Sequence, residues 1–431
     1  MARRIGRALA WSAVGVVGLV ALVATVLPPF LDRVYYQGPV SDHFDGERFF
    51  NPDGDDTGVP TGGSRAGFFW SRLTGAGQPD WPASVAVRPS PPVERPPLKD
   101  GEMRVTWVGH ATALIETPGL NILTDPVWSD RAGPFGFGPK RVAEPGVRFE
   151  DLPPIDLVLV SHNHYDHMDL ATLKRLWERD RPAIVTSLGN DALIRQVTDE
   201  RCTKPMFPHG CEAAGRIEAL DWARGNADSV VAGFTAIRRR DEPAARPSAV
   251  IVTRNHHWGS RWSRDRNRAL WSSFIIDTPS GAVFFAGDTG LGDGKWPAEA
   301  LRSLAALGAQ RAGNTRIRLA LIPIGAFRFK PGQLNTGSHV GPPDALRVWN
   351  RLGRPWTLPI HWGTFRLSSE AYDTPPKMLA ELMRCTGGPP DAFAAHEIGR
   401  SWMVPPAAEH TTIDEALIAP CTRTEAVRAL R

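Results

Sequence analysis

The segment Ser161–His167 constrains the fold of this chain more than any other part of its sequence. It reads Ser-His-Asn-His-Tyr-Asp-His, so that three histidines and one aspartate fall within six residues. It directly follows Ile155–Val160, a nearly all-apolar run that predicts a strand covered on both faces. Imidazole and carboxylate groups are ligands suited to Zn²⁺. Because one tetrahedral zinc cannot use all four side chains and still keep an open position, the spacing favours two metal ions.

Further candidate ligands stand after other strand-like runs. In open α/β sheets, ligand-binding residues follow the carboxyl ends of strands. Four side chains meet this condition: His256, His257, Asp288 and His361. Any one of them alone is as compatible with a satisfied core residue as with a ligand, but their joint occurrence at strand ends favours a shared metal site. Asp288 lies in Gly-Asp-Thr-Gly, where small neighbours let a carboxylate approach two cations closely.

The order of strand-like and helix-like runs predicts an α/β fold. Strand-like runs begin at Met103 and alternate with helical periodicity at residues 169–180, 297–310 and 342–352. Two of the runs are close enough in sequence to form a hairpin, so we expect mixed rather than purely parallel sheets. The 41 glycines and 39 prolines among 431 residues argue against an all-helical bundle.

The complete ligand series resembles that of the metallo-β-lactamase fold: H-x-H-x-D-H, a strand-end histidine, a Gly-Asp-Thr-Gly aspartate and a last strand-end histidine. More closely, roughly residues 40–400 resemble the N-acylphosphatidylethanolamine-hydrolysing phospholipase D (NAPE-PLD-like) family. The segments that carry this closer resemblance are VTWVGHATALIE, LTDPVWSDRAGPFGFGPKR, VSHNHYDHMD, HHWGSRWSRDRNRALWSSFII, FFAGDTG, LIPIGAF, SHVGPPDAL and PIHWGTF. The resemblance implies an αβ/βα four-layer sandwich, in which helices flank two mixed β-sheets.

The resemblance also implies two Zn²⁺ ions and their ligands. His257 matches the family pattern better than His256, because it directly precedes Trp258-Gly259. Seven side chains are implied as ligands, with His162, His164 and His257 on one zinc, Asp166, His167 and His361 on the other, and Asp288 bridging both.

Two further residues match positions that the family keeps beside its metals. Asp125, in a Thr-Asp-Pro turn, is expected to orient a ligand imidazole. His339 is expected to donate to a phosphate oxygen or to the leaving group. For His110 the same role and a purely structural hydrogen bond to the backbone are equally open. We interpret the remaining histidines as structural: His43, His209, His396 and His410.

The resemblance implies metal-assisted hydrolysis of a phosphodiester, with a zinc-bound hydroxide attacking phosphorus. The expected substrate is a phospholipid of the N-acylphosphatidylethanolamine type, which gives phosphatidic acid and an N-acylethanolamine. A lactone or ester hydrolase with the same metals is an alternative, and so is a non-catalytic, membrane-tethered metal-binding protein. The chain departs from the family in the loop Phe327–Pro331, which leaves the head-group preference open.

An apolar N-terminal run predicts a membrane anchor. Ala8–Leu27 contains twenty residues without a charge, about 30 Å of helix, which matches the hydrocarbon core of a bilayer. Arg3, Arg4 and Arg7 precede it, so we expect a single-pass protein of a bacterial inner membrane with a cytoplasmic N-terminus and a periplasmic catalytic domain. A cleaved signal peptide is the alternative.

These features suggest four regions. They are an anchor at residues 1–27, a linker and extension packed on the core at 28–100, a catalytic domain at 101–400 and a tail at 401–431. The four cysteines fall into two local pairs, which are either disulfides or free thiols: Cys202 with Cys211, and Cys385 with Cys421.

The formal net charge of +4 is small for this length and excludes a protein that coats nucleic acid by charge alone. We therefore expect no nucleic-acid partner. Nine arginines nevertheless stand between Arg238 and Arg268, against three acidic residues. Guanidinium groups suit phosphate oxygens and anionic lipid surfaces, so this stretch favours a phospholipid substrate and a membrane surface as partners. An arginine-rich solvated loop is the alternative.

Overall fold

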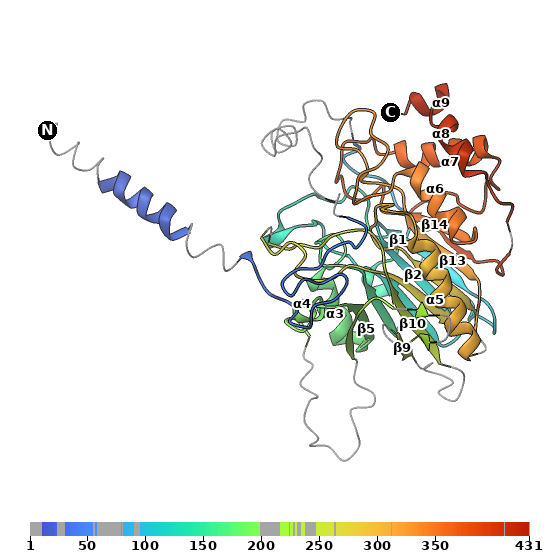
Figure 1. Ribbon diagram of the computed structural model, residues 1–431, viewed down its shortest axis with the longest axis horizontal. Helices are drawn as coiled ribbons and strands as arrows, with labels where there is room; N and C mark the ends of the chain where they lie inside the picture. Colours follow the sequence, from blue (N-terminus) through green and yellow to red (C-terminus); the bar gives the residue numbers. More distant parts are fainter. Residues whose placement is uncertain are drawn as a thin grey trace, which may run out of the picture.

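The computed structural model folds the main body of the chain into two facing β-sheets with helices on their outer sides (Figure 1). It describes residues 11–23, 31–54, 57, 79, 81–89, 95–198, 216–223, 225–226, 229–230, 234–237, 247–262, 264–311, 313–408 and 410–430. The predicted α/β fold with mixed sheets is confirmed.

The first sheet has seven strands among the described residues, in the order β15-β1-β2-β3-β4-β5-β6. The strands are β1 (Arg104–Gly109), β2 (Thr112–Thr117), β3 (Leu120–Thr124), β4 (Leu157–Val160), β5 (Ala183–Ser187), β6 (Ile217–Leu220) and β15 (Ser401–Met403). The pairs from β15 to β3 are antiparallel and those from β3 to β6 are parallel.

The second sheet has six strands in the described part of the chain, in the order β14-β13-β12-β11-β10-β9. They are β9 (Phe234–Ile237), β10 (Ser248–Thr253), β11 (Ser273–Thr278), β12 (Gly281–Phe285), β13 (Ile317–Pro323) and β14 (Trp356–Ile360). The pairs from β9 to β12 are antiparallel, and β12, β13 and β14 are parallel. A short pair, β7 (Gly225–Asn226) and β8 (Ser229–Val230), stands apart.

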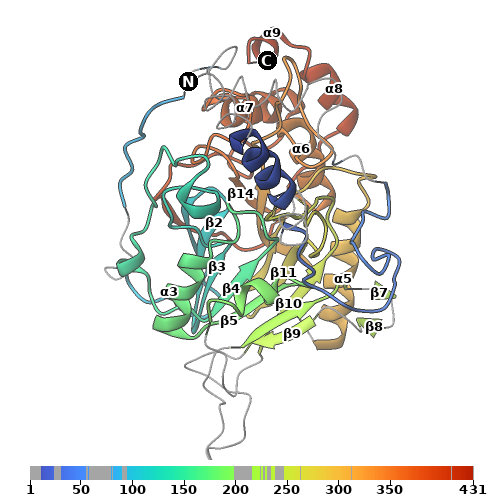
Figure 2. The same ribbon diagram turned by 90° about the vertical axis from the view of Figure 1, so that its left-hand side faces the viewer.

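Strand β4 shows how one apolar run holds two layers together. Because successive side chains of a strand point to opposite faces, Leu157 and Leu159 pack between the two sheets. Val158 and Val160 point the other way and pack against helix α3 (Leu170–Asp180). Figure 2 shows α3 outside the first sheet and α5 outside the second.

The outer face of the second sheet is covered in the same manner. Ala320 and Ile322 of β13 share an apolar cluster with helices α5 (Trp296–Arg311), α6 (Pro342–Arg351) and α7 (Thr374–Thr386). The three expected helices are present as α3, α5 and α6, whereas α7 was not predicted. Helix, sheet, sheet and helix form successive layers. Shorter helices complete the described part of the chain, namely α4 (Asp191–Ile194), α8 (Ile418–Cys421), α9 (Glu425–Arg428) and the 3₁₀ turns η2 (Pro134–Gly136), η3 (Phe149–Asp151) and η5 (Glu415–Leu417).

Residues 31–54 run across the body. Asp32 accepts paired hydrogen bonds from Arg48 and Arg268, at 2.8–2.9 Å. Phe44 and Phe49 are 1% exposed and belong to the core between the sheets. This N-terminal segment is therefore part of the folded body.

The C-terminal residues also belong to the body. β15 pairs with β1 at the edge of the first sheet, and α8 and α9 pack against α7. A disulfide joins Cys385 to Cys421, with Cα atoms 5.8 Å apart. The other predicted pair, Cys202 and Cys211, lies outside the described residues.

The predicted membrane anchor and the inner-membrane location derived from it are corrected by the structure. Residues 11–23 of this region are helical. Within the described residues, no helix combines the length and the apolar character that a membrane crossing needs. The two ends of Ala8–Leu27 lie outside the described residues.

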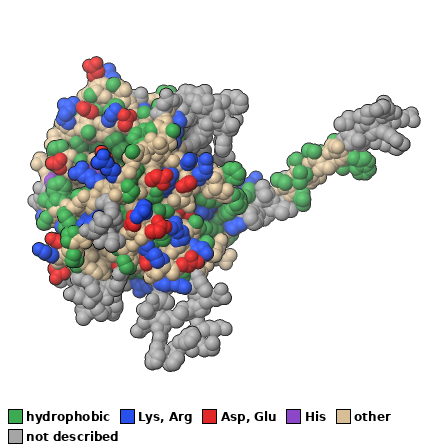
Figure 3. Space-filling model, turned by 180° about the vertical axis from the view of Figure 1, so that it is seen from behind, with side chains coloured by type: hydrophobic (Ala, Val, Ile, Leu, Met, Phe, Trp, Pro, Cys, Tyr) green, Lys and Arg blue, Asp and Glu red, His purple; other side chains and the backbone are tan. Residues whose placement is uncertain are grey.

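The surface charge agrees with the small net charge. Figure 3 shows basic and acidic side chains interspersed over one face of the body.

Candidate metal centre

The predicted ligands meet at one edge of the two sheets, where several strands end. The loop Ser161–His167 follows β4, and Asp288 and His361 follow β12 and β14. His257 lies four residues after β10. Parallel strands bring their carboxyl ends to the same edge, which explains why ligands from distant parts of the sequence converge.

Three histidines form the first group of donor atoms. His162 Nε2 lies 2.8 Å from His164 Nδ1, and the rings of His162 and His257 are 4.7 Å apart. His257 Nδ1 donates to the Ser338 carbonyl at 2.9 Å, so its Nε2 lone pair faces the other two rings. That Nε2 is buried and has no hydrogen-bond partner among the described residues. Three converging nitrogen atoms, one of them unpaired, fit a metal ion.

A second group contains two histidines and two carboxylates. His167 Nε2 and His361 Nε2 are 3.1 Å apart, and each lies 3.4 Å from Asp166 Oδ2. Asp288 Oδ2 lies 3.1 Å from His167 Nε2 and 3.0 Å from His361 Nε2. Four ligands around a tetrahedral zinc with bonds of about 2.0 Å would lie roughly 3.3 Å apart. The separations of these atoms therefore match the edges of a zinc coordination tetrahedron.

Asp288 lies between the two groups. Besides its short contacts to the second group, Asp288 Oδ2 lies 3.9 Å from His257 Nε2. The glycines on either side of it are required, because a side chain at Gly287 would meet Ser161 Cβ at 2.7 Å and one at Gly290 would collide with Gly337. The carboxylate is thus placed where a bridge between two metal ions would stand.

Asp125 lies behind the ligands and is fully buried. It accepts hydrogen bonds from His167 Nδ1 at 2.6 Å and from Ser161 Oγ at 2.6 Å. Since the only proton of the Ser161 hydroxyl goes to Asp125, His162 Nδ1 donates to Ser161 Oγ, at 2.9 Å. Asp125 therefore orients His167 directly and His162 through Ser161, so that both rings turn Nε2 towards the centre.

Burial sets the protonation of the first group. It disfavours the imidazolium form, lowers the pKa of His162 and His257 well below the ordinary value, and lowers that of His164 to about 3. The three rings are therefore neutral at neutral pH, which is the form that binds metal ions.

Opposite charges set the protonation of the second group. Burial raises the pKa of a carboxyl group, but the charge of His167 and the hydrogen bonds from His167 and His361 together outweigh burial and hold the pKa of Asp166 and Asp288 well below the ordinary value. Burial lowers the pKa of His361, whereas Asp288 and Asp166 raise it to about 9. The carboxylates thus favour positive charge between them, and a metal ion would take the place of protons there.

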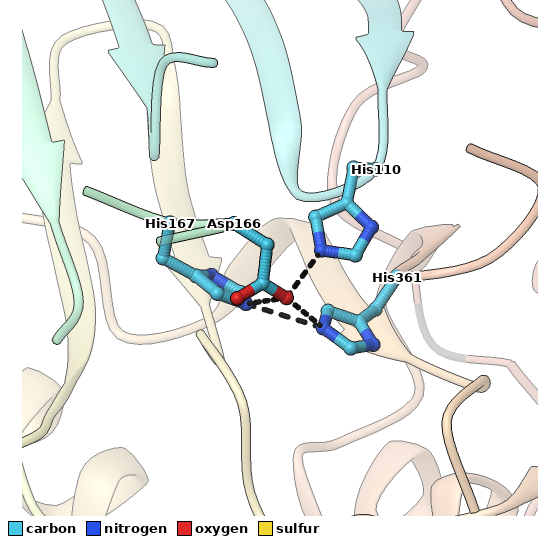
Figure 4. A group of neighbouring side chains, drawn as sticks. All are labelled: His110, Asp166, His167 and His361. Carbon is cyan, nitrogen blue, oxygen red and sulfur yellow. Dashed lines mark hydrogen bonds and ion pairs between the residues drawn. The ribbon is translucent and has the colours of Figure 1, made fainter. Parts of the chain in front are cut away.

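Two more histidines border the cluster. His339 Nδ1 lies 3.7 Å from Asp288 Oδ2, and its side chain is 14% exposed, so it stands at the rim of the centre. His110 is buried with its Nε2 3.0 Å from Asp166 Oδ2, so the structure brings it into the cluster (Figure 4). The sequence signal for His110 is its place in the short break between β1 and β2.

The other histidines lie apart from the centre. His256 turns to Asp53, with Nδ1 3.0 Å from both carboxylate oxygens. His43 lies between Asp42 and Asp221. His396 contacts Trp402, and His410 contacts Trp356. His209 lies outside the described residues.

Within the described residues, arginines of the arginine-rich stretch make contacts inside the body. Arg261 donates to the carbonyl of Asn163, within the ligand loop, and to that of Met168, which follows the loop. Arg268 pairs with Asp32, and Arg254 pairs with Asp293 at 2.8 Å. Arg238, Arg239, Arg240 and Arg246 lie outside the described residues.

Glu370 is a residue that the sequence did not single out. Its carboxylate is 2% exposed and accepts hydrogen bonds from the backbone of Ala326 at 2.6 Å and of Arg328 at 3.1 Å. It thereby holds the loop that departs from the family pattern, and it lines a small cavity together with His361.

Comparison with known proteins agrees with this geometry. A family model described as a beta-lactamase superfamily domain matches residues 120–362. An uncharacterized protein of Mycobacterium tuberculosis is 31% identical over 303 residues, which cover 68% of this chain and 69% of that protein. The N-acyl-phosphatidylethanolamine-hydrolyzing phospholipase D 1 of Caenorhabditis elegans is 32% identical over 302 residues, 69% of this chain and 74% of that protein.

The mitochondrial N-acyl-phosphatidylethanolamine-hydrolyzing phospholipase D of Saccharomyces cerevisiae is 29% identical over 297 residues, 69% of this chain and 55% of that protein. The family match covers more than half of this chain and includes all seven predicted ligand positions. The chain belongs to the beta-lactamase superfamily and is a metal-dependent hydrolase with the metallo-β-lactamase fold.

Proposed function

We propose that this chain is a dinuclear-zinc phosphodiesterase that hydrolyses phospholipids of the N-acylphosphatidylethanolamine type. The observation that carries the proposal is the pair of donor groups joined by Asp288, because hydrolysis of phosphodiesters by two metals needs two ions held close together. The names of the worm and yeast relatives support the choice of substrate.

Two zinc ions bound here would supply an activated water and neutralise charge that develops on the phosphate. Asp288 would fix the spacing of the two positions, and Asp125 would keep His162 and His167 turned towards them. Water adds to phosphorus, and the bond from phosphorus to the ethanolamine oxygen breaks. The phosphate stays with phosphatidic acid, and the N-acylethanolamine leaves as an alcohol after it takes up a proton. We assign to His339, at the rim, a hydrogen bond to a phosphate oxygen or to that leaving oxygen.

A lipid surface is the partner that suits the surroundings of this centre. Phe135 and Phe137 are 83% and 72% exposed at the tip of the loop between Arg131 and Lys140. The base of this loop packs near the ligands, because Ala132 belongs to the same apolar cluster as Tyr165. Exposed aromatic side chains flanked by cations favour contact with lipid head groups and acyl chains. We propose no nucleic-acid partner.

The test combines metal analysis with assays of three substrates: N-acylphosphatidylethanolamine, a simple phosphodiester and a lactone. We expect about two zinc ions per purified chain, and turnover of N-acylphosphatidylethanolamine in mixed micelles. Asp288→Asn should lower that turnover more than about 100-fold, because the loss of a ligand costs more than the loss of an outer partner. Asp277→Asn is the matched control, since Asp277 is a buried carboxylate of β11 that bonds to Asn314 instead of the cluster.

Three results would contradict the proposal. Fewer than one zinc per chain would contradict the dinuclear centre, and unchanged activity of Asp288→Asn would contradict the mechanism. Hydrolysis of lactones without hydrolysis of any phosphodiester would assign the same centre to an ester hydrolase.

A further inference from the structure

We propose that His110 is a positioning residue of the second donor group, which donates its Nε2–H to Asp166 and fixes the backbone of His361. The inference rests on the proposed metal centre and adds a residue that stands outside the seven ligands. Figure 4 shows the rings of His110 and His361 side by side, facing Asp166 and His167.

The surroundings of His110 determine which ring nitrogen carries the proton. Its Nε2 lies 3.0 Å from Asp166 Oδ2, and its buried Nδ1 has no hydrogen-bond partner among the described residues. A proton on Nδ1 would leave a buried donor without an acceptor and would turn the Nε2 lone pair to an ionised carboxylate. Both of these consequences are unfavourable, so the proton belongs on Nε2, from which it is donated to Asp166.

The backbone of His110 is tied to the other ligand of the same group. The His110 carbonyl accepts a hydrogen bond from His361 N at 3.0 Å, and His110 N donates to Thr364 Oγ1 at 2.8 Å. One residue thus reaches Asp166 through its side chain and His361 through its main chain. Displacement of His110 would change both ligands together.

These hydrogen bonds hold the backbone of His110 in a strained conformation. Its φ angle is 53°, in the left-handed region that residues other than glycine rarely adopt. Such angles persist where the surrounding structure demands them, and they concentrate at functional sites. Asp125 and His361, which contact the same centre, also have positive φ angles, of 31° and 64°.

The number of donors favours an outer hydrogen bond over direct ligation by His110. Asp166, His167, His361 and Asp288 already supply the four donors of a tetrahedral zinc, so His110 is left to hold Asp166 from outside, at 3.0 Å. Ligating carboxylates are commonly held by such an outer donor, and loss of the donor typically costs about 10–100-fold in metal affinity.

The variants separate the donor from the backbone. His110→Ala removes the donor and keeps the strained φ, His110→Gly removes the donor and relieves the strain, and His110→Gln offers an amide N–H in place of the imidazole. His396→Ala is the matched control, a histidine that stacks on Trp402 outside the cluster.

The experiment titrates the metal-free chain with Zn²⁺ against a chelating dye and measures kcat and KM with a soluble phosphodiester. We expect His110→Ala and His110→Gly to bind the first equivalent as the unchanged chain does and the second about 10–100-fold more weakly. At limiting zinc kcat should fall without a change in KM, excess zinc should restore part of it, and His110→Gln should lie closer to the unchanged chain.

Two zinc equivalents bound with unchanged affinity in both His110→Ala and His110→Gly would overturn the inference. If His110→Gln bound the second zinc equivalent as weakly as His110→Ala does, the inference would be overturned in favour of direct ligation. If the unchanged chain bound zinc but cleaved no phosphodiester, the proposed function would fail, and the zinc affinities of the variants would still test the role of His110. If it bound no zinc, both would fail.

Discussion

Three histidines of the centre are held by the protein at the same ring nitrogen, Nδ1. His167 Nδ1 is held by Asp125, His257 Nδ1 by the Ser338 carbonyl, and His162 Nδ1 by Ser161. In each of these rings the nitrogen pointing away from the centre is hydrogen-bonded, so that Nε2 points inwards. The orientation of these three rings is therefore built into the fold before any ion binds.

The role of Asp125 can be tested by an isosteric change. In Asp125→Asn an amide NH₂ would face one of the donors now bonded to the carboxylate, from His167 or Ser161. We expect zinc affinity to fall about 10–100-fold, with both equivalents affected because Asp125 orients one ring from each group. Zinc titration against a chelating dye measures this. Wild-type affinity for both equivalents would contradict the role.

The seven predicted ligand positions could be marked in the sequence because each follows a strand whose apolar pattern is readable, and the family resemblance added Asp125. The contacts that His110 and Asn51 make could not be predicted. His110 and Asp166 are separated by 56 positions, and Asn51, which donates to the His257 carbonyl, lies 206 positions from it. Such contacts depend on how distant segments meet, and neither His110 nor Asn51 belongs to a pattern of local periodicity.

At the scale of elements, the segment of residues 41–53 supports the first donor group from outside the region that the superfamily model matches. Asn51 donates to the His257 carbonyl at 2.9 Å, and Asp53 holds His256. Phe49 N donates to the Asn267 carbonyl at 2.8 Å. This N-terminal segment therefore fixes the end of the loop that presents His257.

His43 makes the docking of this segment dependent on pH. Burial lowers the pKa of His43, but hydrogen bonds to Asp221 and Asp42 and their charges raise it, and the net shift is upward. A raised pKa means that the folded state binds the proton more tightly than the unfolded state. The stabilisation is complete below an unfolded pKa of about 6.5 and is lost as pH rises through the folded value.

We therefore expect the free energy of unfolding to fall less in His43→Gln than in the unchanged chain as pH rises above about 6.5, because glutamine carries no titrating proton there. Urea unfolding at several pH values measures the free energy of unfolding of both chains. Other titrating groups are common to the two and cancel in the difference. Parallel stability profiles would show that His43 gains no proton affinity on folding.

The arginine-rich stretch shows why composition alone misleads. The arginines near residue 260 are counted as surface charge in a sequence, yet Arg261 and Arg268 bond to neighbouring segments of the body. Amino-acid composition does not distinguish a guanidinium group that is paired from one that is free.

For the whole molecule, the two sheets share the apolar cluster that lies between them, and the centre lies where strands of both sheets end. The fold class could be predicted because apolar periodicity marks β4, α3 and α6 directly. The pairing of β15 with β1 could not, since a strand of three residues near the C-terminus has too short a pattern and is joined to an edge almost 300 positions away.

The N-terminal part of the chain should divide sharply into a dispensable and an essential stretch. Residues 11–23 are exposed throughout, so a chain that begins at residue 31 should unfold at the same urea concentration as the full chain. It keeps Asp32, which binds Arg48 and Arg268. A chain that begins at residue 54 loses the buried rings of Phe44 and Phe49, and removal of one buried phenylalanine side chain typically costs about 3–5 kcal/mol.

We expect the shorter chain to lose both stability and zinc, because the absence of Asn51 and Asp53 frees the loop that carries His256 and His257. Urea unfolding and zinc titration of the two chains, side by side, measure the two effects separately. Equal stability of both chains would show that residues 31–53 merely rest on the body. Lower stability with unchanged zinc affinity would show that the segment supports the core but not the metal centre.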